Sequence, residues 1–98
     1  MYKDILSTNN IQLNVELSDK EEAIRYTGQI LVDQGYVEPA YIEKMIEREN
    51  VTSTYMGNFV AIPHGVEKSK EEVIASGISV VTVPSGVDFD GNTVKILI

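Results

Sequence analysis

The sequence is organised around residues 57–65, which are Gly-Asn-Phe-Val-Ala-Ile-Pro-His-Gly. Residues 60–62 are apolar enough to form a short buried strand, and the fixed φ of Pro63 ends that strand. The glycine that follows His64 allows the backbone to turn sharply. This order of residues places the imidazole at the C-terminal edge of a strand, on a rim of the domain. His64 is the only histidine in the chain, and we expect the domain to present its ring.

Length and composition limit the classes of protein to which the chain can belong. Its 98 residues are enough for one domain, residues 1–98, with a modest core. We expect neither a membrane span nor a secretory signal, because no long apolar run and no basic N-terminal segment are present. The absence of cysteine excludes disulfides and thiol catalysis and fits a cytoplasmic protein. With one histidine and no cysteine, we expect no metal site.

The chain is acidic, with a formal net charge of −7 and a sequence pI near 4.5. An acidic surface repels phosphate backbones and anionic lipids, so nucleic acid and membrane surfaces are unfavourable partners. A basic protein surface suits this charge better. Many acidic surfaces serve only solubility, and charge alone leaves that alternative open.

A strand and a helix are predicted at the start of the chain. Apolar and polar side chains alternate over residues 11–17, and this period of two predicts a half-buried strand. Ser18 and Glu21 have the spacing of a capping box, which predicts that a helix starts at about Asp19. Gly35 is expected to end that helix.

A second helix is predicted from Pro39, because proline suits the first helical position, to about Asn50. Its apolar stripe consists of Ile42, Met45 and Ile46. Arg48 falls in the last turn, where a cation interacts favourably with the helix dipole.

Short strands are predicted on both sides of the Gly-Asn pair at 57–58. Residues 51–56 favour a strand by composition, and residues 59–62 are apolar. Residues 67–73 are highly charged, and we expect a short solvated helix or a loop there.

The last part of the chain is rich in β-branched residues. Residues 77–83 are almost continuously apolar, which predicts a central strand covered on both faces. Residues 84–86, Pro-Ser-Gly, are expected to break this strand, and the Asp-Gly pair at 90–91 predicts a turn before a strand at 93–98. Because the apolar character continues to Ile98, we expect the chain to be a fragment of a longer domain.

His64 is the leading candidate for chemistry. An imidazole nitrogen is nucleophilic at neutral pH and can carry a phosphoryl group, which needs N–H donors or a positive charge nearby. Gly65 places a free N–H beside the ring, and the guanidinium fork of Arg48 can bind phosphate oxygens. The alternatives are a surface or structural histidine and, for Arg48, a helix cap or an ion pair with Glu47 or Glu49.

Two other patterns do not support a site. Serine and threonine residues are numerous, but none stands in a setting typical of a hydrolase triad. Asp88 and Asp90 precede Gly91, but the full spacing of a calcium loop is missing, so a hairpin turn is the better interpretation.

Glu49, six further residues and then residues 56–65 (Met-Gly-Asn-Phe-Val-Ala-Ile-Pro-His-Gly) resemble a known phosphorylation-site signature. It is that of the mannitol/fructose-type enzyme IIA of the bacterial phosphoenolpyruvate-dependent sugar phosphotransferase system. Residues 10–15, the Arg48-Glu49 pair and residues 84–91 look like the mannitol branch of this family. The whole chain is similar to the first two-thirds of such a domain.

The resemblance implies a phosphotransferase with an α/β fold, in which helices sandwich a mixed sheet. It implies that His64 accepts a phosphoryl group on Nε2 from the carrier HPr and passes it to a cysteine of the mannitol enzyme IIB. It also implies that Arg48 stabilises the phosphate, that no cofactor or metal is needed, and that the sugar is taken up and phosphorylated. The oligomeric state is left open.

The sequence departs from the family in one respect. A second active-site histidine is expected after the strand at 93–98, and the chain has none there. The alternatives are therefore a regulatory enzyme IIA-like interaction module, in which phosphorylation switches contacts, and a fragment without catalytic activity.

Overall fold

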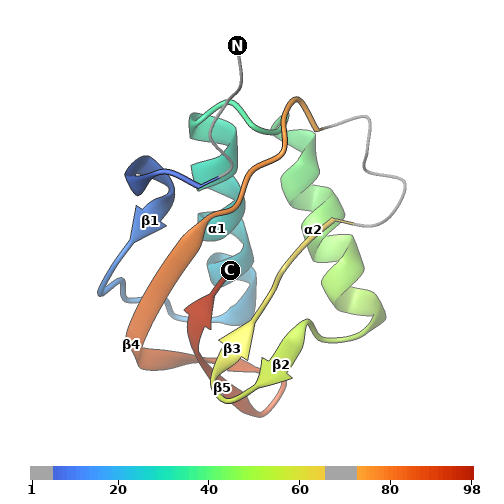
Figure 1. The fold of residues 1–98 in the computed structure, drawn as a ribbon. Coiled ribbons are helices and arrows are strands. Elements are labelled where there is room, and N and C mark those ends of the chain that lie inside the picture. Colours follow the sequence, from blue (N-terminus) through green and yellow to red (C-terminus); the bar gives the residue numbers. More distant parts are fainter. Residues whose placement is uncertain (1–5, 66–72) are drawn as a thin grey trace.

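The computed structural model describes residues 6–65 and 73–98, which form a sheet with two long helices packed on it (Figure 1). The elements in chain order are η1 (Thr8–Asn10), β1 (Ile11–Gln12), α1 (Lys20–Asp33), α2 (Ala40–Val51), β2 (Tyr55–Gly57), β3 (Val60–Ala61), β4 (Val80–Phe89) and β5 (Asn92–Leu97). The short helix or loop predicted at 67–73 lies outside the described residues, except for Val73.

The sheet is mixed, with the strand order β1-β4-β5-β3-β2. β4 and β5 pair antiparallel, as do β2 and β3, whereas β1–β4 and β3–β5 are parallel. This architecture confirms the predicted α/β class with a mixed sheet. In the described part of the chain, α1 and α2 pack on the same face of the sheet, so a second helical layer stays a prediction.

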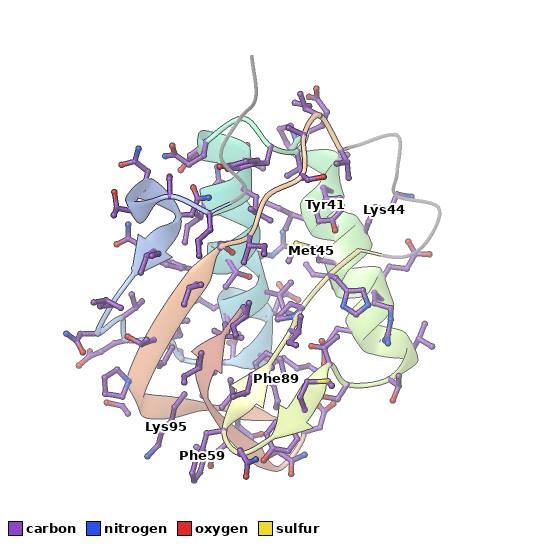
Figure 2. The ribbon with its side chains drawn as sticks, viewed as in Figure 1. Tyr41, Lys44, Met45, Phe59, Phe89 and Lys95 are labelled. Atoms are coloured by element: carbon purple, nitrogen blue, oxygen red, sulfur yellow. The ribbon has the colours of Figure 1, made fainter. Side chains whose placement is uncertain are left out.

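The core lies between this face and the two helices. Phe89, labelled in Figure 2, is fully buried, and Ile24 of α1 and Met45 of α2 belong to the same cluster. In β4, Val81 and Val83 are buried while the alternating Thr82 is only partly covered. Within the described residues the helix side of β4 is sealed, and cover on its second face stays a prediction.

The predicted break at residues 84–86 is wrong. These residues remain inside β4, and the pairing with β5 shifts register between Thr82 and Val87. A bulge admits proline and glycine without ending a strand, because the extra residues leave the ladder of hydrogen bonds. Gly86 has φ +83°, and a Cβ there would lie 2.7 Å from Thr93 Cγ2.

The close approach of the helices sets the position of α2. A Cβ on Gly28 of α1 would lie 2.8 Å from Ile42 Cγ1 and 3.0 Å from Met45 Sδ. Glycine at this position therefore lets α2 pack tightly against α1. Arg25 of α1 also donates to Glu43 of α2 at 2.8 Å.

The N-terminal predictions are confirmed in part. α1 ends before Gly35, as predicted, and Gly35 has a left-handed φ of 78°. β1 stops at Gln12, short of the predicted strand at 11–17, because Asn14 has a left-handed φ of 59° and breaks the alternation.

The cap of α1 is shifted by one residue from the prediction. The side chain of Asp19 accepts a hydrogen bond from the Glu22 N–H at 2.8 Å, and the Glu22 carboxylate in turn accepts from the Ser18 N–H. Glu21 instead binds Arg25 at 3.2 Å. The reciprocal cap therefore uses Asp19 and Glu22 in place of the predicted Ser18 and Glu21.

Asp19→Ala should lower the free energy of unfolding by about 1 kcal/mol, because an N–H of the first helical turn loses its acceptor. Ser18→Ala is the matched control, since only the backbone of Ser18 takes part in the cap. Urea denaturation followed by circular dichroism measures both changes. An equal loss for Ser18→Ala would show that the cap is assigned to the wrong residue.

Candidate functional site

His64 lies three residues beyond the end of β3 and is exposed, as predicted from the apolar run and Pro63. Its Nδ1 lies 2.8 Å from the carbonyl oxygen of Ile62. A carbonyl only accepts, so Nδ1 must carry the proton in this contact, and the lone pair of the neutral ring is on Nε2. The backbone two residues away thus selects the tautomer whose nucleophilic nitrogen is Nε2.

The Gly65 N–H does not have the role expected of it. It donates to the hydroxyl of Tyr41 at 3.0 Å, and the predicted free N–H beside the ring is wrong. This bond ties the segment around His64 to the first turn of α2. The parallel pairing of Val60 and Ala61 with β5 holds the segment from the other side.

A hollow of about 240 Å³ lies beside His64, where α1, α2 and the ends of several strands meet. Its walls are largely apolar, and Figure 2 shows Tyr41 and Met45 on the helix that contributes to it. The residues that line it are Thr27, Leu31, Tyr41, Met45, Ile62, Pro63, His64, Gly77, Ile78, Ser79 and Ile98.

Arg48 is half-buried in the last turn of α2, where its Nη1 donates to the carbonyl oxygen of Thr52 at 2.9 Å. The predicted alternative of a helix cap is therefore confirmed. No ion pair found among residues 6–65 and 73–98 includes Arg48, so pairing with Glu47 or Glu49 is not supported. The cap uses one of the five N–H donors of the guanidinium.

Arg48 lies on the same side of α2 as Tyr41, because seven residues make about two helical turns and about 10 Å along the axis. Tyr41 binds the segment that carries His64, so Arg48 is on the helix face turned toward that segment. Within the described chain, no hydrogen bond joins Arg48 directly to His64.

A buried pair close to these residues joins Glu49, the first residue of the signature quoted above, to Thr54, and this pairing was not predicted. The Glu49 carboxylate accepts from the Thr54 N–H at 2.9 Å and from the Thr54 hydroxyl at 2.6 Å. Both residues are buried. The sequence carries no local signal for this pair, because an acidic residue near a helix end usually faces solvent.

The two aspartates after the β4 bulge form a turn, as predicted. Asp88 Oδ1 accepts from the Gly91 N–H at 3.1 Å, and Asp90 pairs with Lys20 of α1 at 2.8 Å. Across the described residues there is no group of three or more potential metal ligands. The helices found there are also too short or too polar to span a membrane.

Comparison with known proteins assigns the chain to a protein family. Residues 4–98 match the family model of the phosphoenolpyruvate-dependent sugar phosphotransferase system, EIIA 2. The chain belongs to this family. The chain is 60% identical over 99 residues to the mannitol-specific phosphotransferase enzyme IIA component of Geobacillus stearothermophilus, covering 100% of this chain and 68% of that protein. The Bacillus subtilis protein of the same name is 54% identical and is covered over 66% of its length, against 95% of this chain.

Several solved structures share the fold. The crystal structure of IIA mannitol from Escherichia coli has a TM-score of 0.90 and 39% identity, covering 94% of this chain and 67% of that one. The Escherichia coli complex of IIAMTL with phosphorylated IIBMTL gives a TM-score of 0.88, with 37% identity, 99% of this chain and 68% of that one. The nitrogen regulatory protein IIA-Ntr of Neisseria meningitidis is also similar, with a TM-score of 0.73 and 26% identity. The match covers 95% of this chain and 64% of that one.

Proposed function

We propose that this EIIA 2 chain is a phosphocarrier that relays a phosphoryl group through Nε2 of His64. The observation that carries the proposal is the contact between Nδ1 and the Ile62 carbonyl, which leaves the lone pair of an exposed ring on Nε2. The donor is phosphorylated HPr, and the acceptor is a cysteine of the mannitol enzyme IIB. The relay operates in the cytoplasm, and residues 1–98 belong to a single domain.

The relay consists of two displacements at phosphorus. The Nε2 lone pair attacks the phosphoryl group of HPr, so a P–N bond forms on His64 as the bond to the HPr atom breaks. The cysteine thiolate of enzyme IIB then attacks the same phosphorus, and the P–N bond returns its electron pair to Nε2. The proton on Nδ1 stays in place through both steps, held by the Ile62 carbonyl.

The mannitol assignment rests on the similarity to proteins named mannitol-specific, at 60% and 54% identity. The complex in which the Escherichia coli relative holds phosphorylated IIBMTL supports enzyme IIB as the partner. A regulatory role is the second candidate, because the nitrogen regulatory protein IIA-Ntr shares the fold at 26% identity. The higher identity of the mannitol relatives favours the carrier.

The function is tested by incubating the chain with radiolabelled phosphoenolpyruvate and with unlabelled enzyme I and HPr. We expect the chain to acquire an acid-labile, base-stable label, as a phosphohistidine does, and to lose it to the mannitol enzyme IIB. A fructose-type enzyme IIB is the matched control. A stable label that neither enzyme IIB accepts would favour the regulatory role, and a chain that takes no label would contradict the carrier proposal.

Arg48→Ala should slow labelling by about 10²-fold, because removing one preorganised donor to a transferring group costs about that much. Arg48→Lys keeps the charge but loses the planar fork, so we expect an intermediate rate. Rapid-quench labelling by phospho-HPr measures the rates.

Both Arg48 variants can also weaken the helix cap that Arg48 makes on the Thr52 carbonyl. Loss of this cap lowers stability, so labelling rates are compared at a temperature where both variants are fully folded. If the rate for Arg48→Ala equals that of the parent chain, Arg48 acts only as a helix cap.

A further inference from the structure

Glu49 is a buried carboxylate that the relay described above does not use. It lies in the last turn of α2 with 3% of its surface exposed. Carboxylates are seldom buried, and one near a helix C-terminus is repelled by the helix dipole. The position of this carboxylate therefore destabilises the helix by itself, and interactions with another part of the structure must offset that cost.

The carboxylate holds one residue through two bonds. Oε2 accepts from the Thr54 N–H at 2.9 Å and Oε1 accepts from the Thr54 hydroxyl at 2.6 Å. Hydrogen bonds to an ionised group are stronger than neutral ones, and here they are shielded from water. Together they fix the connection from α2 to β2.

Two further bonds join this connection to the imidazole. The Thr54 carbonyl oxygen accepts from the Ile62 N–H at 3.1 Å. The carbonyl of Ile62 then accepts from Nδ1 of His64 at 2.8 Å. The path from the buried acid to the ring therefore passes through two residues and ends on the contact that selects the tautomer.

The same connection also holds the arginine. Arg48 donates to the carbonyl of Thr52, two residues before Thr54. A shift of residues 52–54 would thus displace both the acceptor of the guanidinium and the strand that orients the ring.

We propose that Glu49 is a positioning residue for the phosphoryl relay. It locks Thr54, and through Thr54 and Ile62 it keeps His64 in the tautomer with its lone pair on Nε2. This inference rests on the proposed function for its effect on transfer, whereas its effect on the ring can be measured without any transfer.

The test uses the 15N chemical shifts of the His64 ring, which report the tautomer of the neutral imidazole, together with the rate of labelling by phospho-HPr. In Glu49→Ala we expect a mixture of both tautomers and labelling slowed by about tenfold, because small misplacements are costly in transfer reactions. Glu49→Gln should restore both, since its amide can accept from the Thr54 N–H while donating to the Thr54 hydroxyl.

Thr54→Val and Thr54→Ser extend the test if Glu49→Ala does not fold. Valine has the shape of threonine but lacks the hydroxyl donor, so it should shift the tautomer, whereas serine should not. Glu47→Ala is the control on the same helix, because Glu47 is exposed and its carboxylate makes a long ion pair with Lys44, with 4.0 Å between Nζ and Oε2. It should change neither readout.

The outcomes separate the two proposals. A folded Glu49→Ala or Thr54→Val chain with the parent tautomer and rate overturns the positioning role. A tautomer shift in these variants, with no labelling even of the parent chain, supports the effect of Glu49 on the His64 ring and overturns the relay. Lower stability with an unchanged tautomer would mean that Glu49 is only structural.

Discussion

His64→Ala should abolish labelling of the chain by phosphoenolpyruvate, enzyme I and HPr. The covalent acceptor is removed, and the chain has no second histidine to replace it. We expect a loss of at least about 10³-fold, as is found when a nucleophile is removed. Scintillation counting of the gel-purified chain measures the incorporation.

The fold of this variant should be unchanged, which makes the result interpretable. The His64 ring is exposed, and its one hydrogen bond to residues 6–65 and 73–98 is the contact with the carbonyl of Ile62, so we expect a stability change within about 0.5 kcal/mol. Tyr41→Phe provides a control that perturbs the same segment through Gly65 but keeps the nucleophile. Label on His64→Ala at the level of the parent chain would place the phosphoryl group elsewhere.

Phe89→Ala should produce the largest loss of stability. Phe89 is fully buried between the sheet and the helices, and truncating such a ring costs about 3–5 kcal/mol. Domains of this size are stable by about 5–15 kcal/mol, so the variant should be partly unfolded at moderate temperature. Urea denaturation followed by circular dichroism gives the free energy of unfolding.

Phe59 is the matched control, because it is the other phenylalanine of the chain. It is 51% exposed at the β2–β3 turn, with Lys95 Nζ 5.0 Å from its ring centroid (Figure 2). Phe59→Ala should cost about 1 kcal/mol or less. Equal losses for the two variants would contradict the assignment of the core to the helix side of β4.

Local chemistry explains which parts of the fold could be predicted. Gly35 ends α1 and the Asp-Gly pair at 90–91 forms the last turn, because both need a left-handed backbone that these residues adopt readily. The apolar stripe of α2 follows from its period, and Ile42 and Met45 are indeed buried. These features depend on neighbours within a few residues.

The incorrect predictions depend on contacts that are distant in sequence. Residues 84–86 look like a strand break by composition, but β5 pairs with β4 on both sides of them and keeps them in the strand. The apolar run at 77–83 predicts cover on two faces; α1 and α2 cover one face of the described sheet, and cover on the second face stays a prediction. Pairing partners and layers are not encoded in a local pattern.

In the candidate site, too, the features set by neighbouring residues were predicted, and those set by distant contacts or by burial were not. The position of His64 at a strand edge and the place of Arg48 in the last helical turn were predicted from adjacent residues. The bond from Gly65 to Tyr41 spans 24 residues, and no local pattern indicates it. Glu49 and Thr54 are close in sequence, but their pairing depends on burial that the sequence does not reveal. The relay roles of His64 and Arg48, and a second active-site histidine beyond residue 98, stay predictions.

The central claim is that the phosphoryl group is carried on Nε2 of His64. Phosphorus-31 and nitrogen-15 NMR of the uniformly 15N-labelled, phosphorylated chain tests it most directly, because the P–N bond gives a one-bond coupling to the nitrogen that carries phosphorus. We predict this coupling at Nε2, with Nδ1 still protonated and bound to the Ile62 carbonyl. A coupling at Nδ1, or phosphorus bound to any other residue, would contradict the account.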